Sequence, residues 1–209
     1  TLKLDQQLNI LWSDVYNSSG TFRDEPRAIS IDESGSVYVA GYSETVSDGT
    51  DYKVIKYSPT GSRAWVRSFN GEGSGADTAN AILADAQGLI TITGSSFNGS
   101  NEDYYTQQYD SAGTLLYYKA WNSWDNKNDR PTALAVDPLG NIIVSGQSES
   151  HTGLHYATVR YIKKATVNIP GQQPYSSALA FTENRGQVLT TEQDTISRVL
   201  YYNTQMYPA

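Results

Sequence analysis

The chain of 209 residues contains no cysteine, which excludes disulfide bonds and thiolate metal sites. It has only two histidines, His151 and His155. Both lie in an expected turn between strands, where a spacing of four residues does not form a helical zinc motif. Basic side chains are outnumbered, 15 against 22 acidic ones, and the net charge of −7 argues against nucleic acid or an anionic membrane as a partner.

Long apolar segments are missing as well. No run approaches the roughly 18 residues that a membrane helix needs, so we expect no membrane insertion. The chain does not open with a signal peptide, and we therefore expect either a mature chain or a fragment.

Motifs of common active sites are also absent. The sequence has no G-x-S-x-G elbow and no P-loop, and the segment DNKND at 125–129 has a lysine where a calcium loop needs an oxygen ligand. Paired carboxylates are what glycosidases use, but none of the many carboxylates here stands out from the repeat described next. The sequence therefore predicts no catalytic residue, no metal site and no cofactor.

What the chain does contain is an internal repeat. The segments AISIDESGSVYVAGYS, AILADAQGLITITGSS and ALAVDPLGNIIVSGQS align so that Ala28, Ala81 and Ala133 fall in register, 53 and then 52 residues apart. Each unit consists of four short β-rich runs separated by turn residues. A period of about 50 residues with four strands per unit is typical of a β-propeller blade. A β-sandwich is the alternative, but it gives no reason for so many positions to repeat.

Several repeated positions have a physical meaning. An aspartate followed three residues later by a glycine is turn chemistry, because the carboxylate accepts local backbone N–H bonds and glycine takes a positive φ without a Cβ clash. We therefore interpret the repeated aspartates as structural. The repeated positions are Asp24, Asp77 and Asp129; Asp32, Asp85 and Asp137; Gly35, Gly88 and Gly140; Gly41, Gly94 and Gly146; Ser43, Ser96 and Ser148; Tyr52, Tyr104 and Tyr156; and Tyr57, Tyr109 and Tyr161.

The repeat predicts how the chain is organised. We expect an all-β fold, a β-propeller built of four-stranded blades of about 52 residues. A fourth blade closed jointly by the N- and C-termini is one interpretation of the chain ends. The blades are expected over residues 1–167, with repeats near 24–75, 77–127 and 129–167.

The chain begins inside a blade rather than at the start of one. The segment LKLDQQLNILWSDVYN aligns with IKYSPTGSRAWVRSFN, which sets Trp12 against Trp65 and makes residues 1–20 the last part of a blade. In a closed ring the C-terminus would supply the other strands of that blade and leave no free edge. The third unit departs from the pattern after Tyr161, where we expect a fourth strand that is shortened or lost.

The units resemble a known bacterial repeat. An alanine-led strand, an aspartate, a glycine turn and a strand like Tyr-Val-Thr-Gly, here AISIDESGSVYVAGYS, resemble the β-propeller repeat called SBBP. The resemblance covers three consecutive units, roughly residues 24 to 161. It implies a secreted or surface-exposed bacterial protein, commonly a large multidomain one. It implies no activity, because the repeat residues of that family are structural.

The end of the chain has two interpretations. Residues 168–177 are linker-like. As a degenerate fourth blade, 178–209 match the start of the repeat with one insertion at Arg185, and RVLYYN matches KVIKYS. As a second module, the pieces FTENRGQ and VLYY resemble the start of an uncharacterised domain that accompanies these repeats in large secreted bacterial proteins. The two interpretations predict different chain ends.

The candidate binding site lies on loops. In a propeller, the loops between blades and those between the second and third strands share one face, where ligands usually bind. Trp124 stands outside the repeat, and an exposed tryptophan can stack on a sugar ring or anchor a protein contact. We take Trp124 and Asp125 as candidate ligand-binding residues. The carboxylates expected on this face, where a weak calcium site is weighed against an ordinary solvated surface, include Asp48, Asp51, Glu72, Glu102, Asp103 and Asp125.

Two functions stay open. The first is a non-catalytic extracellular β-propeller module, not an enzyme and without a cofactor, secreted or on the bacterial cell surface. It would contact a protein, a cell-surface glycan or other domains of the same larger polypeptide, in adhesion, scaffolding or assembly. The alternative is a carbohydrate-binding or carbohydrate-active propeller that uses Trp124 and the loop carboxylates.

Overall fold

The computed structural model describes residues 1–18, 22–46, 49–163 and 181–182. These residues form strands, turns and loops and contain no helix, which confirms the prediction of an all-β fold. The strands are β1 (Leu2–Leu4), β2 (Ile10–Ser13), β3 (Asp24–Ile31), β4 (Val37–Glu44), β5 (Thr50–Tyr57), β6 (Arg63–Phe69), β7 (Asp77–Ala84), β8 (Ile90–Phe97), β9 (Glu102–Tyr109), β10 (Leu115–Trp121), β11 (Asp129–Val136), β12 (Ile142–Ser150), β13 (Gly153–Lys163) and β14 (Phe181–Thr182).

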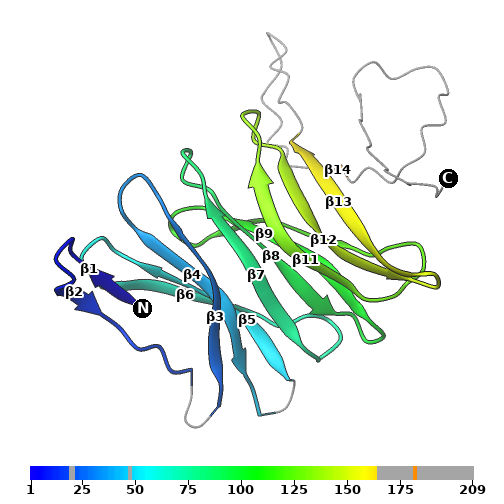
Figure 1. Ribbon diagram of the computed structural model, residues 1–209, viewed down its shortest axis with the longest axis horizontal. Coiled ribbons are helices and arrows are strands. Elements are labelled where there is room, and N and C mark those ends of the chain that lie inside the picture. The colour runs from blue at the N-terminus through cyan, green and yellow to red at the C-terminus, as the bar shows by residue number, and fades with distance from the viewer. Residues whose placement is uncertain (19–21, 47–48, 164–180, 183–209) are drawn as a thin grey trace, which may run out of the picture.

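Each of the three larger sheets is an antiparallel meander of strands in chain order. The first sheet has the order β3-β4-β5-β6, the second β7-β8-β9-β10 and the third β11-β12-β13-β14. Figure 1 shows these sheets side by side in the same sequence. The first strand of a unit makes the contact with the unit before it: β7 packs on β3, β4 and β5, and β11 packs on β7, β8 and β9.

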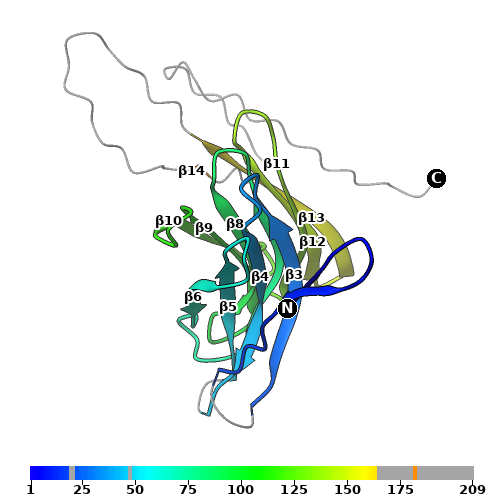
Figure 2. The same cartoon turned by 90° about the vertical axis from the view of Figure 1, so that its left-hand side faces the viewer.

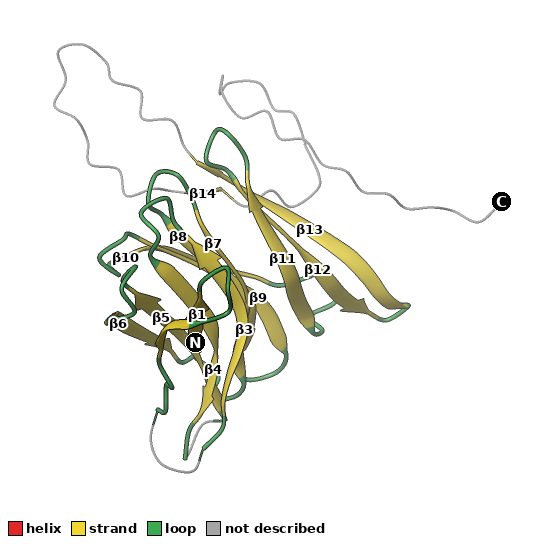
Figure 3. Ribbon diagram, turned by 60° about the vertical axis from the view of Figure 1, so that its left-hand side comes forward, coloured by secondary structure: helices red, strands yellow, loops and turns green. Residues whose placement is uncertain are grey.

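The fourth sheet is the small β1-β2 hairpin at the N-terminus. In the described part of the chain, the sheets stand in a row and do not close into a ring (Figures 2 and 3). The structure therefore establishes four antiparallel sheets in an all-β fold.

The units repeat their strand pairing as well as their sequence. In the second sheet, the pairing of β7 with β8 shifts between Ala79 and Ala81, and corresponding shifts occur in the first and third sheets. A Cβ atom at Gly94 would collide with the carbonyl oxygen of Thr78, which lies on this irregular strand. The same collision would occur at Gly41 and Gly146, so the close approach of two backbones explains this repeated glycine.

The first turns of the units also repeat. The Oδ1 atom of each turn aspartate accepts the backbone N–H four residues later, and each turn glycine has a positive φ between 76° and 82°. This confirms the interpretation of these aspartates as structural residues. The bonds run from Ser36 to Asp32 (2.9 Å), from Leu89 to Asp85 (2.8 Å) and from Asn141 to Asp137 (2.9 Å).

The N-terminal hairpin has the pairing of the last two strands of a unit. Lys3 on β1 lies opposite Trp12 on β2, just as Lys56 on β5 lies opposite Trp65 on β6. In both hairpins the register shifts at the next residue of the earlier strand. Residues 1–13 therefore form, behind the first sheet, a copy of the hairpin that β5 and β6 form behind the second.

We call the face of a sheet that is turned toward the following unit its front face, and the opposite face its rear face. On the front face of the first sheet, Tyr38, Tyr52 and Val54 are buried and pack against Ile82 and Ile92 on the rear face of the second. The core of the described residues thus lies between sheets rather than inside any one of them.

Aromatic rings connect each unit to the next in the same way. The first ring of each outer strand lies against the last tyrosine of the third strand in the following sheet. The pairs are Trp12 with Tyr57, at 5.6 Å between ring centroids, Trp65 with Tyr109, at 6.3 Å, and Tyr117 with Tyr161, at 6.3 Å. One interface therefore occurs three times along the chain.

Little of the C-terminal part belongs to the described residues. Phe181 and Thr182 pair with Lys163 and Ile162 at the outer edge of the third sheet, where the other units have a full fourth strand. The linker-like residues 168–177 lie outside the described residues. So do 178–180 and 183–209, and both interpretations of the tail stay predictions.

Candidate functional site

Loops of neighbouring units meet at one end of the molecule. The backbone N–H of Gly73, between the first two units, donates to the carbonyl oxygen of Phe97 in the second unit (3.2 Å). The N–H of Glu149 donates in the same way to the carbonyl oxygen of Asn128 (2.9 Å). This confirms the prediction that the loops between units and those between second and third strands share a face.

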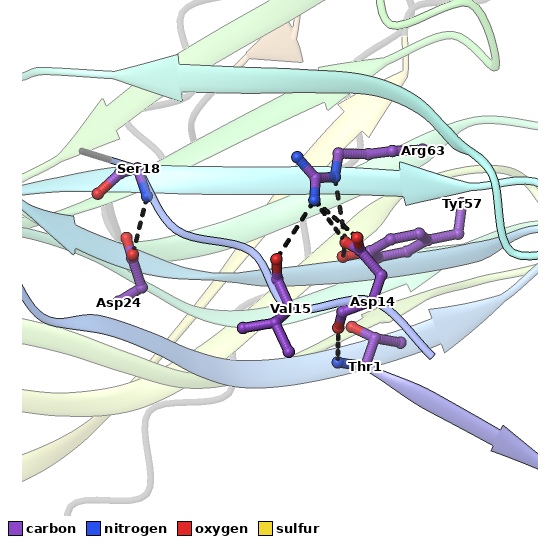
Figure 4. A network of polar contacts seen from close by, with 7 residues as sticks. All are labelled: Thr1, Asp14, Val15, Ser18, Asp24, Tyr57 and Arg63. Carbon is purple, nitrogen blue, oxygen red and sulfur yellow. Dashed lines mark hydrogen bonds and ion pairs between the residues drawn. The ribbon is translucent and has the colours of Figure 1, made fainter. Parts of the chain in front are cut away.

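The repeated aspartate before each first strand holds the preceding loop. Its Oδ2 atom accepts the backbone N–H of the residue six positions earlier, and the aspartate lies opposite the repeated serine of the second strand. These bonds run from Ser18 to Asp24 (2.9 Å; Figure 4), from Gly71 to Asp77 (2.6 Å) and from Ser123 to Asp129 (2.7 Å). The bonds anchor the loop face, so these carboxylates have a structural use.

These three carboxyls differ in their pKa values. Asp77 and Asp129 have no exposed surface, and burial raises the pKa of both although hydrogen bonds act in the opposite direction. Asp24 is only partly buried. Burial also acts to raise its pKa, but hydrogen bonds from Ser43 and Ser18 outweigh burial, and the pKa of Asp24 is lowered. The position of a unit in the row thus sets the sign of the shift.

The structure places the two predicted ligand-binding residues next to each other in the loop before β11. Trp124 is 87% exposed and is available for contact with a partner. Asp125 instead links two loops, because its Oδ2 atom accepts the backbone N–H of His151 (3.1 Å) and its Oδ1 atom lies 3.3 Å from the His151 Nδ1 atom. That backbone bond is the main cause of the lowered pKa of Asp125. The two residues are neighbours, but the carboxylate of Asp125 already bonds to another loop of the same chain.

Two other carboxylates of the loop face, Glu102 and Asp103, are engaged with neighbours. Glu102 forms an ion pair with Arg130 (2.5 Å), and Asp103 accepts a hydrogen bond from Asn98 Nδ2 (2.8 Å). Burial raises the pKa of Asp103 to about 6. Asp48 lies outside the described residues. In the part of the chain that the structure describes, no three His, Asp or Glu side chains converge in an arrangement that could hold a metal ion.

The structure also contains a groove that the sequence did not reveal. Its volume is about 440 Å³, and it lies where the outer strands of the first and second sheets diverge. Phe69 on β6 stacks on Tyr105 on β9, with 4.1 Å between ring centroids, and Tyr105 stacks on Tyr118 on β10 at 5.9 Å. Tyr118 is 60% exposed, so an aromatic surface is accessible from solvent.

Polar groups line one end of the groove. Glu72, Asn98 and Asp103 come from the loop face and lie along the same cavity as the three rings. Burial is the main cause that raises the pKa of Tyr105, and the charge of Glu72 adds to it. Aromatic rings beside carboxylate and amide groups suit a sugar, whose apolar face stacks on a ring while its hydroxyls form hydrogen bonds. The residues that line the groove come from two units and stand at different positions of the repeat. An alignment of the units therefore does not bring them together.

A smaller cavity of about 190 Å³ lies behind the first sheet. The N-terminal segment is fixed at its edge, because Arg63 pairs with Asp14 (2.7 Å) and the Tyr57 hydroxyl donates to Asp14 Oδ2 (2.9 Å; Figure 4). Burial acts to raise the pKa of Asp14, but Arg63 and Tyr57 outweigh it, and the pKa is lowered. The carboxylate of Asp14 at the edge of this cavity is therefore paired with Arg63.

No helix among the described residues is long and apolar enough to span a membrane. Comparison of the sequence with protein-family models and with curated proteins finds no match. The resemblance to SBBP repeats therefore stays an expectation.

Proposed function

We propose that the three large sheets are blades of a β-propeller and that the chain is a non-catalytic, extracellular interaction module. The observation that carries this proposal is the interface that repeats between successive units, in which a first strand packs on the preceding sheet and a Trp or Tyr ring of the outer strand lies on the next tyrosine. Four-stranded meanders stacked in this way are how a propeller is built.

The roles of the repeated carboxylates support a module without catalysis. A glycoside hydrolase needs two carboxyl groups that face a bound substrate. Here Asp32, Asp85 and Asp137 fix turns, and Asp77 and Asp129 anchor loops. The chemistry that the repeat supplies is used to hold the fold together, which leaves the loops to make contacts.

The setting follows from the resemblance to a secreted bacterial repeat, and the lack of cysteine and the net charge of −7 fit it. Partners would be a protein, a surface glycan or other domains of the same polypeptide. Binding of the labelled chain to intact cells of its source tests this role. We expect saturable binding that Trp124→Ala weakens. Binding that is equal for Trp124→Ala and wild type would contradict the role of Trp124, and no binding to cells would contradict the module.

Carbohydrate binding is the second candidate, and the aromatic groove favours it. Stacking on one ring contributes about 1 kcal/mol beyond the area buried, so the rings of Phe69, Tyr105 and Tyr118 would support weak but selective sugar binding. A glycan panel separates the candidates. Binding that is lost in Tyr118→Ala and kept in Leu139→Ala, an exposed turn residue, would favour the groove. Release of reducing sugar by the wild-type chain would contradict a non-catalytic module.

A further inference from the structure

The front face of the third sheet is the one front face that the described residues leave uncovered. In the first two units the repeated tyrosine of the third strand has no exposed surface, and its hydroxyl donates to the following sheet: Tyr52 to the carbonyl oxygen of Tyr105 (3.2 Å) and Tyr104 to that of Ala157 (3.3 Å). The equivalent residue of the third unit, Tyr156, is 96% exposed.

The neighbours of Tyr156 show the same difference. Thr93 and Thr106, on the front face of the second sheet, are fully buried, whereas their counterparts Ser145 and Thr158 are at least partly exposed. The rear face of the third sheet is covered, as it is in the second unit. Ile142 and Val144 have no exposed surface there. We call the exposed front face the open face, and it consists of Ile143, Ser145, Gln147, Leu154, Tyr156 and Thr158.

The opposite end of the row has the matching deficiency. Ile82, on the rear face of the second sheet, is 9% exposed because the first sheet covers it. Its counterpart in the first sheet is Ile29, which is 62% exposed, and Ile31 beside it is 61% exposed. The cavity behind the first sheet adjoins this strand through Glu25 and Pro26. The open face would pack on a first strand whose rear face is uncovered, and β3 is such a strand.

The strand edges at the two ends of the row also complement each other. Along Leu154–Arg160 no described strand pairs with the outer edge of β13, since β14 pairs only with Ile162 and Lys163. At the other end of the row, β2 has the sequence and pairing of an outer strand and lies behind the first sheet. Among the described residues, one end of the row thus has an inner strand whose outer edge is largely unpaired, and the other end has a strand of the outer type.

We propose that two copies of this chain associate head to tail. The open face of one copy covers the rear face of β3 in the other, and β2 of the second copy pairs with β13 of the first. The three residues of β1 occupy the place that Val159–Tyr161 would take, so β1 is displaced. Leu2 and Leu4 on β1 are 53% and 40% exposed, so its displacement uncovers little apolar surface, although it breaks the pairing of β1 with β2.

A second copy is the occupant that the geometry favours, because each sheet is a copy of the others. The front face of the first sheet packs on the rear of the second, and the front face of the second packs on the rear of the third, so we infer that the front face of the third fits the rear of the first. A two-fold axis applies the same contact twice. The two rows of three sheets then close into a ring of six blades, within the range of four to eight blades found in propellers. This closure rests on the proposed propeller, whereas the contact itself repeats an interface within the chain.

Sedimentation of the full chain over a range of concentrations tests the proposal. We expect a species of 46 kDa, twice the 23.0 kDa of one chain. Tyr156→Glu and Ile29→Glu should each weaken association by roughly 30-fold or more, because each places a charge in the centre of the contact. Leu139→Glu, at an exposed turn residue outside the open face, should leave it unchanged. A monomer at all concentrations, or an open-ended series of larger species, would overturn the proposal.

A disulfide tests the register. Lys53 lies opposite Ser68 in the first sheet, and the equivalent pair across the joint is Ala157 of one copy and Val15 of the other. Because the chain has no cysteine, Val15→Cys and Ala157→Cys introduce its only two thiols, and peptide mapping shows which of them are joined. We expect a cross-linked dimer on oxidation and none with Val15→Cys and Leu139→Cys. A bond formed within one chain, or no bond, would contradict a head-to-tail dimer. Neither result bears on the ligand role of Trp124.

Discussion

The second and third sheets have nearly the same internal structure and very different surroundings. Thr93 and Thr106 share a hydrogen bond of 3.0 Å on the front face of the second sheet, and Ser145 and Thr158 share one of the same length on the third. The first pair is fully buried and the second pair is not. This hydrogen bond therefore forms whether or not a following sheet buries the pair. The buried apolar side chains of the clusters that join the three large sheets lie between sheets, so their hydrophobic contribution to stability comes from contacts between units.

The largest expected effect comes from comparing the two equivalent tyrosines. Tyr104→Ala should lower the free energy of unfolding by about 3–5 kcal/mol, because it empties a fully buried site between two sheets. Tyr156→Ala should change it by less than about 0.5 kcal/mol in dilute solution, because the side chain is exposed there. Urea denaturation of both variants measures the difference. Equal losses would show that the third sheet is covered in the monomer.

The next effect concerns the repeated glycine. Gly94→Ala should lower the free energy of unfolding by about 1–3 kcal/mol or more, because the new Cβ atom would collide with the carbonyl oxygen of Thr78. Ser95→Ala, at the next position of the same strand, is the control and should cost less. Thermal unfolding followed by circular dichroism compares the two. A Gly94→Ala protein as stable as the control would contradict the close approach of the two strands.

The pKa of Asp103 gives a smaller, pH-dependent effect. Burial raises this pKa to about 6 in the folded chain, above the value of 3.8 for a free carboxyl. The folded state therefore holds this proton more tightly than the unfolded state, and ionisation costs stability as pH rises between these two values. The cost is about 3 kcal/mol by pH 7. At the equivalent position the third unit has the exposed residue His155.

Asp103→Asn tests this cost, because an amide keeps an acceptor for Asn98 but does not ionise. We expect the free energy of unfolding of the wild type to fall, relative to that of Asp103→Asn, as the pH is raised from about 4 to about 7. Asp77 also has a raised pKa, but it is present in both proteins. The charge of Asp129 adds to the raised pKa of Asp103, so the measured difference includes the interaction between these two carboxyls. An identical pH dependence in the two proteins would show that Asp103 is not buried as described.

The smallest effect on stability is expected on the loop face. Trp124→Ala should change the free energy of unfolding by less than about 0.5 kcal/mol, since 87% of the residue is exposed. Asp125→Ala should cost more, because the backbone N–H of His151 loses its acceptor. Denaturation curves of the two neighbours separate an exposed contact residue from a structural one. A large loss in Trp124→Ala would contradict its assignment to binding.

Much of this fold could be predicted from sequence because its physical requirements repeat. An Asp and a Gly three residues apart specify a turn through local bonds, and three copies of that turn fixed the alignment from which the strands followed. The same alignment set Trp12 against Trp65, and in the structure Trp12 lies on Tyr57 as Trp65 lies on Tyr109. That residues 1–20 are the end of a blade stays a prediction.

The functional surfaces were harder to predict, because they depend on contacts between units. Tyr104 and Tyr156 occupy the same column, and nothing in either residue says that one is buried and the other exposed. The groove at Phe69, Tyr105 and Tyr118 combines rings from two units and has no motif of its own. Asp125 was expected to bind a ligand, but its bond to His151 depends on how two loops meet.

Hydroxyl-radical labelling of the tyrosines, read by mass spectrometry over a range of protein concentrations, tests the central claim most directly. The claim is that each front face is built to receive another unit and that the described residues leave the third front face open. We predict that Tyr104 is protected at every concentration, whereas Tyr156 is labelled in dilute solution and becomes protected as the chain associates. Protection of Tyr156 in the dilute monomer would contradict the account.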